Sequence, residues 1–375
     1  MTDCPYILFC AGEDSGDAIG ESLVKVVVAE GRFNAVGAGG ARMQAAGMQS
    51  IVNYEDLPVS GFGDVLPRYF KLRCHFQALC EALKSEKCLG LVAIDYPGFN
   101  MKLVHLAGML KKPCLYVAPP QVWAWKAKRA KELAQNSFAK LAVFFDFEEC
   151  VYKEAGCNVV RVNHPFADVV AQVQSLNNLV CHCEECRDAA THILLLPGSR
   201  KSQALRNLPI YLNAVKDIQD VVVIAARQEL VPIFEKFGVQ VKVAPQNAQE
   251  RAALYQSAKY AITAPGTATL ELALSGSPMV VCTKPDLLTY CLGRLFIKTK
   301  FFALPNIILN RPVFPEYIVA PFEKPKDGLL QSLSHHRDDA TTEKCTQEIS
   351  AELREKLSTE NSLDSLMAEF LRQFV

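Results

Sequence analysis

The chain has 375 residues, half of them hydrophobic, and its 40 basic residues balance its 40 acidic ones. This length exceeds what one hydrophobic core organises, so we expect two domains. The charge balance argues against a nucleic-acid partner. The start of the chain lacks a basic leader, and no apolar run reaches the ~18 residues of a membrane span. We therefore expect a cytoplasmic protein.

Apolar strands alternate with amphipathic helices along both halves of the chain, which predicts parallel sheets covered on both faces. In the first half we expect strands at Tyr6–Ala11, Ala35–Val36, Leu89–Ile94, Cys114–Val117, Leu141–Phe144 and Val159–Val162. In the second half we expect them at Ile193–Leu196, Val221–Ala225, Val239–Val243, Tyr260–Thr263 and Met279–Cys282.

The apolar rhythm lapses at 171–191, which indicates a joint between domains. We predict an α/β protein with two Rossmann-like, doubly wound domains, residues 1–170 and 190–340, that face a cleft. Ligands of such sheets bind at the carboxyl ends of the strands. Residues 341–375 are predicted to form a tail of amphipathic helices.

Two loops of the second half have the character of phosphate-binding sites. Residues 196–200 and 266–271 each follow a predicted strand and open a predicted helix, whose first N–H groups have no partner within the helix. Arg200 brings a guanidinium suited to a diphosphate, and Glu271 is placed to accept hydrogen bonds from sugar hydroxyls. Together they indicate a nucleotide diphosphate ligand.

In the first half, the loop 12–17 carries three carboxylates at a helix start. This composition disfavours phosphate and suits a neutral, hydroxyl-rich ligand or a catalytic base. The alternative is that Asp14 or Ser15 simply caps the helix.

Asp95 ends a predicted central strand and is the candidate general base, since it would point from the carboxyl edge of the sheet. The alternative is an N-cap, although Asn100 suits that role better. His164 follows another strand beside the domain joint and is a further candidate.

The two tryptophans, Trp123 and Trp125, precede four cations in six residues. The segment is a candidate surface for lipid head groups or a phosphorylated substrate, or else a solvated helix face. A second candidate surface includes Phe62, Leu66 and Phe70, with cations alongside; the alternative is that its helix packs this face on the sheet.

Two further motifs are weak. The cluster 181–186 holds three of the 14 cysteines, but its spacing is too compact for a usual zinc cage, and a polar linker is the simpler interpretation. Residues 37–42 fail the dinucleotide fingerprint because Arg42 stands at the third glycine position. We expect neither a metal nor a cofactor.

Seven motifs, in order along nearly the whole chain, make the sequence resemble the lipid-A-disaccharide synthase family. They lie at residues 11–17, 37–44, 94–100, 121–125, 195–200, 266–271 and 304–306. One departure is Gly98, which stands where the family has a second aspartate, so Asp95 is the single carboxylate of its motif.

The resemblance implies an inverting GT-B glycosyltransferase at the cytoplasmic face of the inner membrane. Its substrates would be UDP-2,3-diacylglucosamine and 2,3-diacylglucosamine 1-phosphate, with no metal required. Asp95 would be the base. The UDP site would comprise Ser199, Arg200, Gly266, Thr267, Glu271 and Asn306, and the acceptor side Glu13, Ser15, Asp17 and His164.

Other hypotheses stay open at this stage. A GT-B nucleotide-sugar epimerase would use the same nucleotide half-site, and a non-catalytic nucleotide-sugar-binding protein would tolerate loss of Asp95. Whether the chain works as a monomer or a homodimer is also open.

Overall fold

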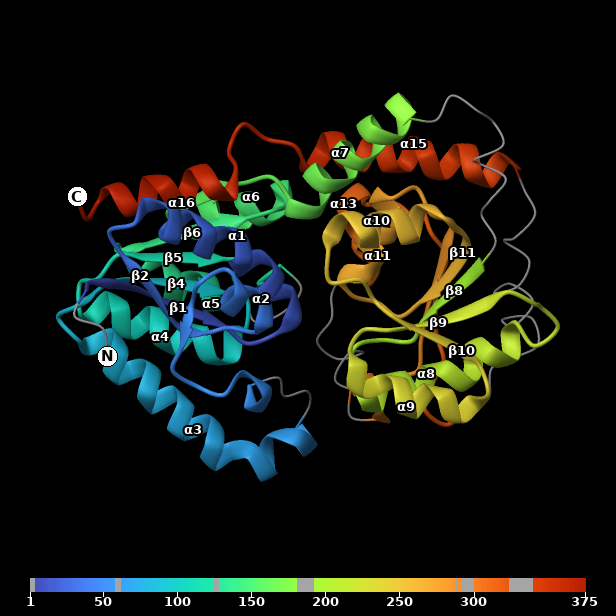
Figure 1. Cartoon of the computed structure of the whole chain (residues 1–375), viewed down its shortest axis with the longest axis horizontal. Coiled ribbons are helices and arrows are strands. Elements are labelled where there is room, and N and C mark those ends of the chain that lie inside the picture. The colour runs from blue at the N-terminus through green and yellow to red at the C-terminus, as the bar shows by residue number, and fades with distance from the viewer. Residues whose placement is uncertain are drawn as a thin grey trace. The chain divides into compact units, whose positions relative to one another are not determined.

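The computed structural model of the chain describes residues 4–57, 62–123, 128–180, 192–287, 289–291, 300–323 and 340–375. At 62–69, 174–180 and 340–343 it describes the backbone alone. The chain folds as two compact units, one formed by Met1–Pro165 with Ser358–Val375 and the other by Phe166–Leu357. Each unit has its own parallel sheet (Figure 1).

The first unit is built on a seven-stranded parallel sheet in the order β3-β2-β1-β4-β5-β6-β7. Its strands are β1 Tyr6–Ala11, β2 Asn34–Ala38, β3 Gln49–Ser50, β4 Cys88–Ile94, β5 Cys114–Val117, β6 Ala139–Val143 and β7 Val159–Arg161. Its helices are α1 Asp14–Glu30, α2 Ala41–Ala45, η1 Tyr54–Asp56, α3 Phe62–Lys84, α4 Pro97–Met109, α5 Lys128–Ala134, α6 Asp146–Glu154 and α16 Leu363–Arg372.

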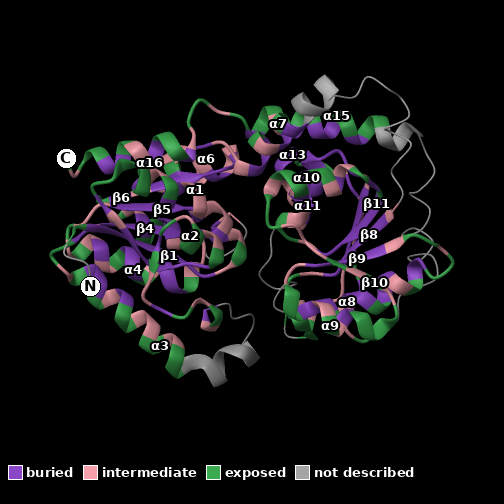
Figure 2. Cartoon of the chain, viewed as in Figure 1, coloured by how far each residue is buried: buried purple, intermediate pink, exposed green. Residues whose placement is uncertain are grey.

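Helices cover both faces of this sheet, with α1 and α16 on one face and α3 and α4 on the other (Figure 1). Every residue of β1 is buried, since the strand lies between two neighbours and under both helical layers. Figure 2 shows the central strands in the colour of buried residues and the helices with exposed outer faces. This explains why these strands are continuously apolar rather than alternating.

The second unit repeats the architecture with six parallel strands in the order β10-β9-β8-β11-β12-β13. The strands are β8 His192–Leu196, β9 Val221–Ala225, β10 Gln240–Val243, β11 Ala258–Thr263, β12 Met279–Thr283 and β13 Glu316–Ile318. Its helices are α7 Pro165–Val180, α8 Lys201–Ala214, η3 Gln228–Leu230, α9 Val231–Phe234, η4 Glu235–Phe237, α10 Ala248–Gln256, α11 Thr267–Leu274, α13 Leu304–Leu309 and α15 Ala340–Leu357. The predicted α/β class with two Rossmann-like domains is confirmed.

The C-terminal segment predicted as one tail is divided between the two units. Helix α15 packs on α11 and α13, and Ser350 donates a hydrogen bond to the carbonyl of Leu274. Helix α16 instead packs on α1 and buries Leu363, Leu366, Met367, Phe370 and Leu371. Its apolar face is therefore part of the core of the first unit.

Helix α4 begins before Asn100, the residue that the sequence favoured as its cap. It starts at Pro97. Both Asp95 and Tyr96 have positive φ, of 46° and 50°, which turns the chain sharply enough for proline to occupy the first helical position. Asn100 lies inside the first turn and is fully buried.

None of the helices in the described ranges combines the length and the apolar composition needed to cross a bilayer.

Candidate active site

The turn that carries Asp95 lies at the carboxyl end of β4, a central strand of the first unit. Two consecutive non-glycine residues in the left-handed region cost about 1–3 kcal/mol each, so the surrounding structure must hold them. The side-chain amide nitrogen of Asn100 does so. It lies 3.1, 3.1 and 2.8 Å from the carbonyl oxygens of Cys10, Ile94 and Asp95.

Tyr96 fixes the other side of this turn. Its hydroxyl donates a 2.8 Å hydrogen bond to the carbonyl of Leu57, and its ring lies over Gly12. A Cβ at position 12 would stand 2.3 Å from that ring, so the close approach requires glycine. The turn after β4 and the loop after β1 are thus held together, and Asp95 is half-buried beside them.

The structure separates the carboxylates of the loop 12–17. Glu13 and Ser15 are half-buried at the start of α1, next to the turn after β4. Asp17 is 6% exposed, and its carboxylate accepts hydrogen bonds from the backbone N–H groups of Arg42 and Met43, both at 3.1 Å. Asp17, predicted to lie on the acceptor side, thus caps α2 and holds the loop after β2.

His164, predicted for the acceptor side, is packed against an aromatic ring. Its ring packs edge-on against Phe144, with 5.0 Å between the ring centroids. Burial lowers the pKa of this imidazole to about 4, so it is neutral at pH 7. A neutral, packed imidazole contributes shape at the end of β7 rather than a positive charge for a phosphate.

A buried carboxylate that the sequence did not single out lies at the same edge of the sheet. Glu148, in the first turn of α6, is 5% exposed and accepts a 3.2 Å hydrogen bond from the indole nitrogen of Trp123. Burial, with a smaller contribution from the charge of Asp95, raises the pKa of Glu148 to about 7. Its position within a surface-type Phe-Glu-Glu sequence gave no sign of this burial.

Trp123, predicted for a lipid-binding surface, also contacts Phe147. Its indole is half-buried and packs edge-on against that ring, with centroids 5.1 Å apart. Trp125 lies outside the described residues, as do the side chains of Phe62 and Leu66. Phe70 is described and is 76% exposed.

The two predicted phosphate loops lie side by side in the second unit, because β8 and β11 are neighbours in its sheet. The backbone N–H of Ala264 donates a 2.9 Å hydrogen bond to Leu196, at the point where the two strands end. Ser199 and Arg200 are exposed just before α8, and Gly266 and Thr267 are exposed at the start of α11. Gly266 has a φ of 150°, which favours glycine.

Glu271 forms an ion pair with a residue that the sequence analysis did not predict. Arg251 donates to both carboxylate oxygens of Glu271, at 2.9 and 3.1 Å. Arg251 is held in turn by the carbonyls of Pro245 and Gln246 and lies over the ring of Phe166. Because a carboxylate has about four acceptor positions, Glu271 keeps capacity for a ligand while Arg251 fixes its orientation.

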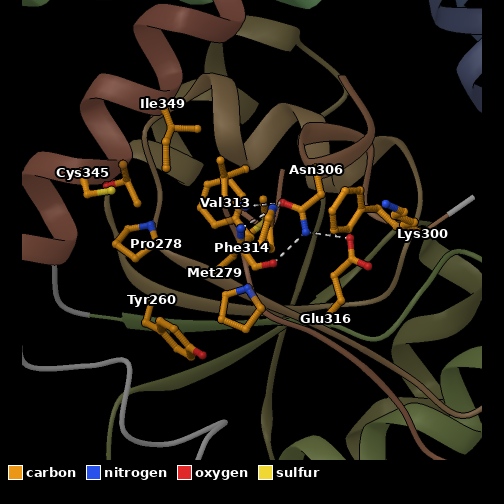
Figure 3. A pocket seen from close by; sticks show the side chains of 14 residues that line it. Tyr260, Pro278, Met279, Lys300, Asn306, Val313, Phe314, Glu316, Cys345 and Ile349 are labelled. Atoms are coloured by element: carbon orange, nitrogen blue, oxygen red, sulfur yellow. Dashed lines mark hydrogen bonds between the residues drawn. The ribbon is translucent and has the colours of Figure 1, made fainter. Parts of the chain in front are cut away.

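Asn306, predicted for the UDP site, is a buried residue that bonds to its own unit. Its amide oxygen accepts from the backbone of Val313 and Phe314, and its amide nitrogen donates to Phe314 and to Glu316, the latter at 2.7 Å (Figure 3). The side chain is fully buried. Its hydrogen-bonding capacity is therefore used within the protein.

Asn306 and Glu316 line a cavity of about 700 Å³ (Figure 3). Met279 and Pro315 also line it; Met279 is the first residue of β12, and Pro315 directly precedes β13. The phosphate loops lie at the carboxyl ends of β8 and β11. The cavity is therefore at the opposite edge of the sheet from the predicted nucleotide site.

Within the described ranges, no three His, Cys, Asp or Glu side chains gather in a way that could hold a metal ion. The cysteine cluster at 181–186 lies outside those ranges.

Comparison with known proteins identifies the family. Residues 7–370 match the family described as lipid-A-disaccharide synthetase. The chain belongs to the lipid-A-disaccharide synthase family. It is 31% identical to lipid-A-disaccharide synthase 1 of Legionella pneumophila strain Paris, over 98% of this chain and 97% of the relative. It is 33% identical to the lipid-A-disaccharide synthase of Syntrophus aciditrophicus strain SB, over 83% of each.

Solved structures agree on the fold. UGT89C1 of Arabidopsis thaliana superposes with a TM-score of 0.59 at 13% identity, over 98% of this chain and all of that one. MurG of Acinetobacter baumannii superposes with a TM-score of 0.55 at 12% identity, over 97% of this chain and 99% of that one. The fold is GT-B, and the family makes the protein an enzyme of the glycosyltransferase class. The epimerase and the non-catalytic binding protein are therefore set aside.

The raised pKa of Glu148 predicts a distinct pH dependence of stability. The folded state keeps the proton up to about pH 7, whereas the ordinary value is 4.5. The contribution of Glu148 to the free energy of unfolding is therefore fully present below pH 4.5 and is lost as the pH rises through about 7. Denaturant unfolding from pH 5 to pH 8 should show wild type losing up to about 3 kcal/mol more than Glu148→Gln. Glu149→Gln, at the surface pair with Lys153, should behave as wild type.

Proposed function

We propose that the enzyme transfers diacylglucosamine from UDP-2,3-diacylglucosamine to 2,3-diacylglucosamine 1-phosphate. The products are a β-1,6-linked lipid A disaccharide 1-phosphate and UDP. Membership of the family supports the overall reaction. The observation that carries the mechanism is the strained turn at the end of β4, which holds a carboxylate beside the loop after β1. Strain of this kind is concentrated at functional sites.

The transfer is a single displacement with inversion at the anomeric carbon. The 6-hydroxyl oxygen of the acceptor attacks that carbon while the bond to the UDP oxygen breaks. The hydroxyl proton goes to a base as the nucleophile loses it. Asp95 is the base in this proposal, because it is a half-buried carboxylate on a rigidly held turn at the carboxyl edge.

The second unit would bind UDP at the edge formed by the loops after β8 and β11. The N-termini of α8 and α11 supply N–H groups and positive partial charge to the diphosphate. Arg200 and Ser199 stand exposed at the first of these helices, and Thr267 at the second. Glu271, oriented by Arg251, would accept hydrogen bonds from the ribose. These groups offset the charge of leaving UDP without a metal.

The acceptor would lie at the carboxyl edge of the first unit, where Glu13 and Ser15 are half-buried beside the turn of Asp95. A carboxylate and a hydroxyl at this point suit sugar hydroxyls. The adjacent loop after β2 is held by Asp17, whose carboxylate is used for that purpose.

Both lipid substrates reside in a bilayer, so we propose that the enzyme associates peripherally with the inner membrane through α3. Leu72 and Phe76 of this helix pack against the core of the first unit. Phe70, Lys71 and Arg73 are exposed. An exposed aromatic ring beside cations is the pattern of a helix that lies at a lipid interface.

The reaction is tested by incubating the enzyme with both lipid substrates and detecting the disaccharide 1-phosphate by mass spectrometry. Asp95→Asn keeps the size of the side chain but removes the base, so turnover should fall about 10²–10⁴-fold. UDP affinity should be unchanged. Near-full turnover in this variant would show that Asp95 is not the base.

The nucleotide site is tested by calorimetry with UDP. Arg200→Ala should weaken binding by about 1.5–3 kcal/mol, because a hydrogen bond to a charged group is lost. Lys216→Ala removes an exposed cation after α8, at the opposite end of that helix, and is the matched control. Equal affinities in the two variants would place the diphosphate elsewhere.

The membrane surface is tested by sedimentation with anionic vesicles. Each cation near the bilayer contributes about 1 kcal/mol, so binding should be partial and should weaken with salt. Changing Phe62, Leu66 and Phe70 together to Ser should release the protein, while Phe138→Ser, at another exposed ring of the first unit, should not. Release by both variants, or by neither, would argue against α3.

A further inference from the structure

Glu148 is a buried carboxylate that the proposed mechanism does not use. It stands in the first turn of α6, after β6, and only 5% of it is exposed. The indole N–H of Trp123 and the backbone N–H groups of Phe144 and Phe145 all bond to its carboxylate. Burial of an ionisable group costs free energy unless the group is hydrogen-bonded, and these three donors offset part of that cost for Glu148.

Glu148 lies where α6 holds the loop after β5. The described part of that loop, Ala118 to Trp123, is bonded to α6 at two points. The hydroxyl of Tyr152 donates to the carbonyl of Pro120 at 2.5 Å, and Trp123 donates to Glu148 at 3.2 Å. β5 is next to β4 in the sheet, so this loop borders the turn of Asp95.

Burial makes the largest contribution to the raised pKa of Glu148, and the negative charge of Asp95 adds a smaller one. Three other ionisable groups of the first unit lie in this region: Tyr152, Arg129 and His164. Tyr152 has its pKa raised far out of the neutral range by burial, and Arg129 of α5 acts on that tyrosine. His164, on the far side of Phe144, is neutral above about pH 4.

We propose that Glu148 is a positioning residue of the transferase site, which acts through its hydrogen bond to Trp123 and its charge beside Asp95. The ionised carboxylate makes a charge-assisted bond that fixes the loop after β5. Its charge also makes the two carboxylates together a better acceptor for the hydroxyl proton. The part played by Asp95 rests on the proposed function; the coupling of Glu148 to Trp123 does not.

The coupling is tested without substrate. The chain has two tryptophans, so Trp125→Phe leaves Trp123 as the sole indole. Its fluorescence should change with a midpoint near pH 7, where Glu148 gains its proton. Adding Glu148→Gln should remove the transition between pH 6 and 8. Adding Asp95→Asn should move the midpoint to lower pH, because a neighbouring negative charge is lost.

Three fluorescence results would overturn the proposal. The first is an emission that stays constant from pH 5.5 to 8.5. The second is a transition that survives Glu148→Gln. The third is a midpoint that Asp95→Asn leaves in place, since Glu148 would then titrate independently of the base.

The kinetic test separates positioning from mere stability. Glu148→Gln should lower kcat roughly tenfold, as for a weakened bond to a charged group, and should remove the inflection near pH 7 from the profile of kcat/KM. Its UDP affinity should match wild type. Trp123→Phe keeps a ring but lacks the N–H, and should raise KM for the acceptor. Wild-type kcat and pH profile in Glu148→Gln would refute the role.

The two proposals fail in different ways. If wild type forms no disaccharide, the proposed function fails, and the fluorescence titration still decides whether Glu148 is coupled to Trp123 and Asp95. If wild type forms the disaccharide and Glu148→Gln behaves identically, only the role of Glu148 fails.

Discussion

The amide of Asn100 is the interaction on which the first unit's reactive edge depends. It reaches the carbonyl oxygens of β1, of β4 and of the turn itself. Two adjacent residues in the left-handed region would otherwise relax, since each is strained by about 1–3 kcal/mol. With the turn held, Asp95 is presented at the strand end and α4 can start at Pro97. The buried amide thus stabilises the strained turn and fixes the position of the Asp95 carboxylate.

In the second unit, the proposed nucleotide site combines positive charge with an oriented carboxylate. Helix N-termini give the positive charge directly from the backbone. Glu271 would be free to rotate without a partner, and Arg251 prevents this by bonding both oxygens. Asn306 and Glu316 hold the segment 302–316 around α13. Orientation here comes from buried polar pairs rather than from apolar packing.

The sequence predicted well where a signal is local. Continuous apolar runs became strands, and glycine-rich loops after them became helix starts, as at Gly266. It gave no sign of partners that are distant in the chain. The local motif of Asn306 says nothing of its bond to Glu316. Trp123 and Glu148, which bond to each other, lie 25 positions apart. An exposed-looking acidic helix start gave no hint that Glu148 is buried.

The sequence by itself therefore determined the two Rossmann-like domains, the family and the loops that bear the candidate site. The reason is that hydrophobic periodicity and glycine placement are properties of neighbouring residues. Only the tertiary structure decided which of the polar candidates are buried and bonded inside the protein. Asp17, Asn306 and Glu148 have no local signal of this, because their burial and partners arise when distant strands and helices come together.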